Sequence, residues 1–137
     1  MASIQKEILI EASPENVWAA VRDVGAVHQR LVPGVLVDAR LDGDARVVTF
    51  ASGAVARELL VDVDDKARRF AYAVVEGPLR ATHHNASMQV FANGKGRSRL
   101  VWITDVLPND LAASISTLVE QGSAAMKLTL EKEAARG

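Results

Sequence analysis

The polar side chains that could do chemistry inside a fold are few. They are three histidines (His28, His83 and His84), the only tyrosine, and a glutamate within a strand-like run. His83 and His84 are adjacent in another such run, and neighbouring strand residues point to opposite faces, so these two cannot hold one metal ion. His84 shares its parity with the apolar Ala86 and Met88. We therefore expect His84 to face the interior, His83 to face solvent, and no metal to be bound.

The glutamate is Glu58, in the run 54–63, and its surroundings decide its chemistry. A carboxylate in an apolar interior has a raised pKa and can orient a ligand hydroxyl or accept a proton. The alternative is a salt bridge across the sheet, to the neighbours of Arg57 or to Arg80. Strict alternation along the run directs Glu58 outward and would bury Val55, Leu59, Val61 and Val63.

Tyr72, the tyrosine, shares a strand face with Phe70 and Val74. It could form the wall of a cavity with its hydroxyl toward a ligand, or pack in an ordinary core. Met88 has the same two interpretations, as a pliable cavity wall or as core. No G-x-S-x-G motif is present, and the sequence assigns no catalytic residue.

These residues must be positioned by a chain that changes its periodicity twice. A strand over 3–11 precedes Ser13 and Pro14, a good helix cap and first helical residue, and two short helices follow. Six strand-like runs separated by turn residues come next, at 35–41, 45–50, 54–63, 69–75, 82–92 and 97–106. Helical spacing then continues beyond Asp110, a plausible cap, for about 25 residues. This order predicts an antiparallel meander covered by one long helix.

Composition narrows the function classes. The 137 residues carry 16 basic and 17 acidic side chains, which leaves no excess of positive charge for nucleic acid. The absence of cysteine excludes disulfides and cysteine-bound metal or clusters. No apolar run is long enough to cross a membrane and no secretion signal opens the chain, so we expect no stable membrane insertion and a cytoplasmic location. The length predicts a single domain over 1–137.

Several short motifs occur together in a recognisable order. They are Ser13-Pro14-Glu15-Asn16-Val17-Trp18, Leu31-Val32-Pro33-Gly34-Val35, Gly53-Ala54-Val55-Ala56-Arg57-Glu58-Leu59-Leu60, Phe70-Ala71-Tyr72, Glu76-Gly77-Pro78-Leu79 and Trp102. With this order and spacing, the chain resembles the polyketide cyclase/dehydrase and lipid-transport family. That family is START-like and similar to birch-pollen allergens and plant abscisic-acid receptors.

The resemblance implies an α+β helix-grip fold. A curved, seven-stranded antiparallel sheet would wrap around the long C-terminal helix, with two short helices after the first strand and an apolar cavity between sheet and helix. It also implies that Glu58 and Leu60 face inward, which requires a β-bulge between Leu60 and Val63. The expected ligand contacts are Glu58, Leu60, Tyr72, Val74, His84, Ala86, Met88 and Ala125.

Three functions are compatible with this fold. The first is binding of a small hydrophobic ligand, such as a lipid, polyketide or aromatic metabolite, without a cofactor. The second is a cyclase or dehydratase that uses Glu58 and His84 as acid and base. The third is a protein-interaction module, a toxin or co-chaperone relative. No sequence feature specifies an oligomeric state.

Overall fold

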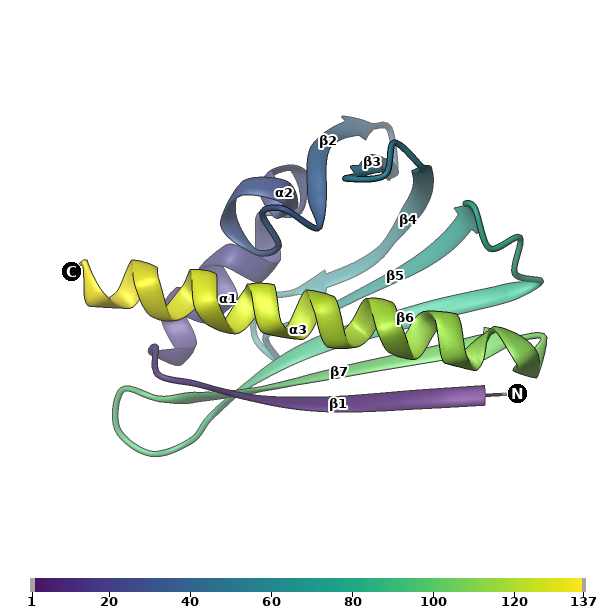
Figure 1. Cartoon of the computed structure of the whole chain (residues 1–137). Helices are drawn as coiled ribbons and strands as arrows, with labels where there is room; N and C mark the ends of the chain where they lie inside the picture. Colours follow the sequence, from purple (N-terminus) through teal and green to yellow (C-terminus); the bar gives the residue numbers. More distant parts are fainter. Residues whose placement is uncertain (1, 137) are drawn as a thin grey trace.

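The computed structural model describes residues 2–136. Its elements follow the predicted order (Figure 1). They are β1 (Ala2–Ile10), α1 (Pro14–Arg22), a 3₁₀ turn η1 (Val24–Ala26), α2 (Val27–Arg30), β2 (Leu36–Asp42), β3 (Ala45–Phe50), β4 (Val55–Asp64), β5 (Arg69–Glu76), β6 (His83–Ala92), β7 (Ser98–Leu107), a second 3₁₀ turn η2 (Asn109–Leu111) and α3 (Ala112–Ala135).

All seven strands form one antiparallel sheet in the order β1-β7-β6-β5-β4-β3-β2. Strands β2 to β7 are a meander with short connections, and β1 joins the free side of β7. The sheet curves, and α3 runs along its concave side (Figure 1). The predicted α+β helix-grip fold, with two short helices after the first strand, is therefore confirmed.

Polar contacts fix α3 beside β1. The Lys6 ammonium lies 3.0 Å from the Glu120 carboxylate. The Lys127 ammonium donates to the carbonyl of Leu9 at 2.6 Å, and the backbone N–H of Glu11 donates to Glu131 at 2.9 Å. One side of the helix is thereby attached along the length of the edge strand.

The predicted cap of the long helix was wrong. Asp110 lies in the 3₁₀ turn η2, and Leu111 occupies the N-cap position of α3 without a side-chain hydrogen bond. The turn η2 delays the regular helix until Ala112, because its last backbone N–H bonds three residues back to Pro108.

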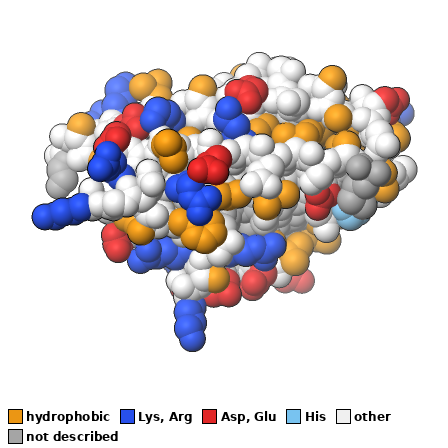
Figure 2. Space-filling model, turned by 90° about the horizontal axis from the view of Figure 1, so that it is seen from below, with side chains coloured by type: hydrophobic (Ala, Val, Ile, Leu, Met, Phe, Trp, Pro, Cys, Tyr) orange, Lys and Arg blue, Asp and Glu red, His pale blue; other side chains and the backbone are white. Residues whose placement is uncertain are grey.

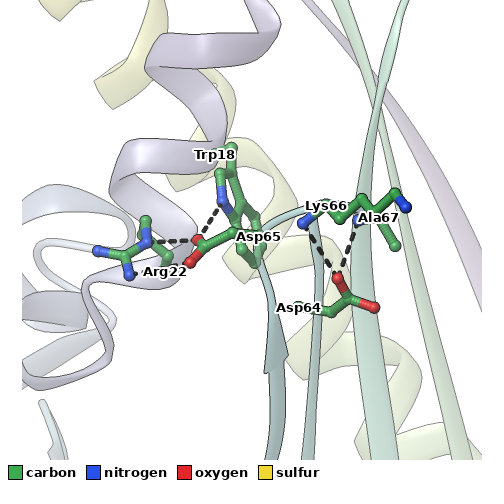
Figure 3. Close-up of polar contacts among 6 residues, drawn as sticks. All are labelled: Trp18, Arg22, Asp64, Asp65, Lys66 and Ala67. Atoms are coloured by element: carbon green, nitrogen blue, oxygen red, sulfur yellow. Dashed lines mark hydrogen bonds and ion pairs between the residues drawn. The ribbon is translucent and has the colours of Figure 1, made fainter.

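Helix α1 forms where its cap predicts. The Ser13 hydroxyl accepts the Asn16 backbone N–H at 3.2 Å, and Pro14 occupies the first helical position. The far side of the helix is held by the turn between β4 and β5 (Figure 3). There the Asp65 carboxylate accepts the Trp18 indole N–H at 2.9 Å and the Arg22 Nε–H at 2.7 Å.

Strand β4 settles the conflict over Glu58. Ala56 and Glu58 point inward, whereas the exposed fractions of Val55, Leu59, Val61 and Val63 are 51%, 39%, 60% and 36%. The prediction from strict alternation, that these four residues are buried and Glu58 faces outward, was therefore wrong. The register with β5 shifts between Leu60 and Asp62, which leaves Val61 without a partner. This bulge lies between Leu60 and Val63, where the resemblance requires it, and follows the inward Glu58 and the half-buried Leu60.

Candidate ligand-binding site

A cavity of about 390 Å³ lies between the concave face of the sheet and α3. Strands β2 to β7, helix α2 with the segment that follows it, and the loop between β5 and β6 complete its wall. The contribution of α3 is a single face with helical spacing, formed by Ile115, Leu118, Val119, Gly122 and Met126. Most of the wall is apolar, so the cavity suits an apolar ligand of moderate size.

A buried ion pair is the main polar feature of the wall. Arg46 and Glu58 are register partners on β3 and β4, so their side chains leave the sheet on the same face. The Arg46 Nε–H donates to Glu58 Oε1 at 2.7 Å, and the side chains are only 5% and 11% exposed. Arg46 also donates through Nη1 to the carbonyl of Val24 at 3.1 Å. Arg46 is thus held at two points, by the sheet and by the turn before α2.

Two aromatic rings support the guanidinium. Phe70 and Tyr72 stack with their ring centroids 5.3 Å apart. The Arg46 guanidinium carbon lies 5.0 Å from the Phe70 centroid and 5.4 Å from that of Tyr72. At these distances both rings make cation–π contacts with the arginine, which holds its orientation in the cavity wall.

The Tyr72 hydroxyl stays protonated. Burial raises the pKa of Tyr72, and the negative charge of Glu58 raises it further. A protonated phenol is both a donor and an acceptor of hydrogen bonds. Tyr72 can therefore act as a polar contact for a ligand, beside the ion pair.

His84 is half-buried and lies in the cavity wall, as expected, while its neighbour His83 is not part of that wall. Burial lowers the pKa of His84, and the adjacent His83 lowers it further. His84 is accordingly neutral at pH 7, with one ring nitrogen as a donor and the other as an acceptor.

Trp102 sets how closely α3 approaches the sheet. A Cβ placed on Gly122 would lie 2.9 Å from Cζ3 and 3.0 Å from Cη2 of the Trp102 ring. Any side chain at position 122 would therefore require the Trp102 ring to move. The Trp102 indole nitrogen is buried and has no hydrogen-bond partner among residues 2–136, and the ring also lines the cavity.

The structure brings five of the eight expected contacts to the cavity: Glu58, Tyr72, Val74, His84 and Met88. The other three, Leu60, Ala86 and Ala125, belong to the hydrophobic core or its edge. Leu60 is next to the β4 bulge and packs against the core. Ala86 lies between its register partners Tyr72 and Thr104, which both reach the cavity, and its methyl group is too short to extend past them. Ala125 precedes the cavity residue Met126 on α3 and lines a separate depression that Pro33 also borders.

Sequence reasoning missed Arg46, although the signal was present. Arg46 has the parity of Val48 and Phe50 in a short strand-like run, which places a charge on the apolar side. A buried charge requires a partner of opposite sign, and Glu58 is the carboxylate on the adjacent strand. The salt-bridge alternative for Glu58 was correct in kind, but its partner is neither Arg80 nor a neighbour of Arg57. Arg57 itself pairs with Asp42 at 2.7 Å.

Other site classes find little support between residues 2 and 136. No group of three or more histidine, aspartate or glutamate side chains there could hold a metal ion. None of the helices in that range is long and apolar enough to cross a membrane. On the face seen in Figure 2, basic and acidic side chains are intermingled, and hydrophobic side chains lie between them.

Comparison with known proteins finds a matching family for the sequence and similar structures for the fold. The sequence profile of the family described as polyketide cyclase/dehydrase and lipid transport matches residues 1–136. No curated protein matches the chain significantly.

Three solved structures illustrate the similarity in fold. An uncharacterized protein from Bacillus thuringiensis superposes with a TM-score of 0.85 at 19% identity, over 94% of this chain and 98% of that one. Norcoclaurine synthase from Thalictrum flavum, in complex with dopamine and hydroxybenzaldehyde, gives 0.74 at 20% identity, over 98% and 87%. A START superfamily protein from Mycobacterium smegmatis gives 0.72 at 15% identity, over 98% and 97%. At these identities the likeness concerns the fold alone.

Proposed function

The chain belongs to the polyketide cyclase/dehydrase and lipid-transport family, and on that premise we propose that it binds one small hydrophobic ligand between the sheet and α3. The observation that carries the proposal is the apolar cavity of about 390 Å³ with a buried ion pair in its wall. Apolar surface that a ligand buries there contributes roughly 25 cal/mol per Å² before the costs of ordering. The polar groups then orient the ligand.

The proposed ligand contacts are the cavity residues with polar groups or pliable side chains. Arg46, Glu58 and Tyr72 form a polar cluster on the sheet, and His84 and Met88 line the same cavity. The apolar face of α3 covers the ligand from the opposite side. A lipid, a polyketide or an aromatic metabolite would fit this division between polar and apolar walls.

Catalysis by Glu58 and His84 is a weaker proposal. Oε1 of Glu58 already accepts a hydrogen bond from Arg46 at 2.7 Å, so this oxygen is occupied by a residue of the protein and not by a substrate proton. An orienting role for Glu58 agrees better with this contact. The open volume beneath α3 also favours a ligand over a protein-interaction module with a vestigial cavity.

Titration with 1-aminoanthracene, an uncharged fluorophore, would test the proposal. We expect saturable binding with one site per chain and its loss in Leu118→Trp, because Leu118 lines the cavity and the larger indole would fill it. Leu128→Trp is the matched control, since Leu128 lies on the same helix with 64% of its surface exposed. Binding that survives Leu118→Trp, or no binding at all, would contradict the proposal. Native mass spectrometry of gently purified protein would identify a co-purified ligand.

A further inference from the structure

The buried ion pair in the cavity wall carries no net charge. Arg46 and Glu58 contribute one charge of each sign, their contact is 2.7 Å, and both side chains are almost fully shielded from solvent. Of the other charged residues in the wall, Glu76 and Arg80 are exposed and also of opposite sign. The site is therefore neutral both at the buried ion pair and in total.

The pair retains hydrogen-bonding capacity. Arg46 uses Nε on Glu58 and Nη1 on the carbonyl of Val24, while Glu58 accepts through Oε1. The remaining atoms, Nη2 of Arg46 and Oε2 of Glu58, have no partner among residues 2–136. Neither is among the fully sealed, unpaired polar atoms, so both remain accessible in the cavity wall. The wall thus offers a donor beside an acceptor, with the protonated Tyr72 hydroxyl on a neighbouring strand.

This arrangement penalises a charged ligand. An ionised carboxylate in the cavity would be attracted to Arg46 but repelled by Glu58, so that the buried group would become net negative after the ligand had lost its hydration. An uncharged hydroxyl or carbonyl has a much smaller desolvation cost. A hydroxyl can donate to Oε2, and either group can accept from Nη2.

Building on the proposed ligand-binding function, we propose that this cavity selects uncharged ligands with a hydroxyl or carbonyl at their polar end over ionised carboxylates with the same apolar body. Phenols and hydroxy-ketones belong to the favoured class. The selecting element is the Arg46–Glu58 pair, which acts by its zero net charge and not by its shape.

Calorimetric titration with 1-naphthol and 1-naphthoate tests this selection, because the two probes share their rings and at pH 7 only the second is charged. We expect the wild type to bind 1-naphthol at least about tenfold more tightly. Glu58→Gln makes the site net positive and should shift the preference toward 1-naphthoate. Arg46→Gln makes it net negative and should shift the preference further toward 1-naphthol.

Opposite shifts of preference in the two variants are the decisive result, because general damage to the site would weaken the binding of both probes alike. Arg40→Gln removes an exposed arginine outside the cavity and should leave the preference unchanged. Circular dichroism would establish whether each variant is folded. If either variant is unfolded, the preference of the wild type for 1-naphthol or 1-naphthoate decides whether the proposal holds. The proposed selection would be overturned if the wild type bound 1-naphthoate as tightly as 1-naphthol or more tightly. It would also be overturned if the preferences of both variants shifted in the same direction. In either case the proposed ligand binding itself would stand. Failure of both naphthalene probes and of 1-aminoanthracene would overturn the proposed function as well.

Discussion

Gly122→Ala would show whether the contact between α3 and Trp102 controls the cavity. The new Cβ would lie 2.9 Å and 3.0 Å from two atoms of the Trp102 ring, closer than carbon atoms pack, so the ring must move. Overpacking of this kind costs about 1–3 kcal/mol in a core that cannot yield. Alanine in a helix gains about 1 kcal/mol over glycine. Because the Trp102 ring borders an open cavity of about 390 Å³, it has space to rotate into.

We therefore expect the free energy of unfolding of Gly122→Ala to stay within about 1 kcal/mol of the wild type. The rotated ring would occupy ligand volume, so the affinity for 1-aminoanthracene should fall at least tenfold, about 1.4 kcal/mol. Urea denaturation and fluorescence titration measure the two quantities. Gln121→Ala, on the exposed side of the same helix, is the control and should leave the affinity unchanged.

A loss of more than about 3 kcal/mol together with unchanged affinity would refute this reasoning. It would mean that Trp102 is locked in place and that the helix, not the ring, moves aside. Unchanged stability and unchanged affinity together would mean that the new methyl group is accommodated without any movement toward the cavity.

Three further outcomes follow from single contacts. Ser13→Ala removes the cap of α1, whose hydroxyl accepts the Asn16 N–H at 3.2 Å, and should lower the free energy of unfolding by about 1 kcal/mol in urea denaturation; an unchanged value would mean that water replaces the cap. In a double-mutant cycle, Arg46→Met should cost about 3–5 kcal/mol by leaving Glu58 buried without a partner, whereas adding Glu58→Leu should restore most of the loss; additive losses would contradict this. Burial lowers the pKa of His84 below its value of about 6.5 in the unfolded chain, so the unfolded state takes up the proton first. As the pH falls from 7 to 5, the free energy of unfolding of the wild type should therefore decrease relative to that of His84→Gln. If the free energies of unfolding of the two proteins changed in parallel with pH, the buried, neutral state of His84 would be contradicted.

The fold followed from periodicity and turn residues, with errors where one residue changes a register. Ser13 and Pro14 start α1 as their types predict, since a cap is a local property of the chain. The face of Glu58 was different, because the apolar Val55, Leu59 and Val61 lie on the exposed face and the register with β5 shifts on both sides of Glu58. Alternation alone has no information about bulges. The family resemblance predicted that Glu58 faces inward, and this prediction was correct.

The site was less predictable because it depends on contacts between strands. Tyr72 and His84 could be found from parity, since each lies on the apolar side of its own strand. The partner of Glu58 could not be found that way, because Arg46 lies twelve residues away and becomes its neighbour only through the β3–β4 register. Gly122 lies on the cavity face of α3, but its approach to Trp102 is a distance between two elements, which the periodicity of the sequence does not contain.

An open cavity and a buried ion pair both reduce stability, so other contacts must keep the fold from collapsing around them. The attachment of α3 supplies one. Near its start, Ile115 and Val119 pack with Val106 in a small core cluster, and near its end Met126 and Leu130 belong to the main core. The face of the helix that carries these residues also lines the cavity, and the contacts of α3 with Leu9 and Glu11 fix one side of the helix. Collapse of the helix onto the sheet would require one core cluster to separate. The cavity therefore persists because α3 is held in two core clusters, one toward each of its ends, and the same residues Ile115, Val119 and Met126 present their remaining surface to the cavity.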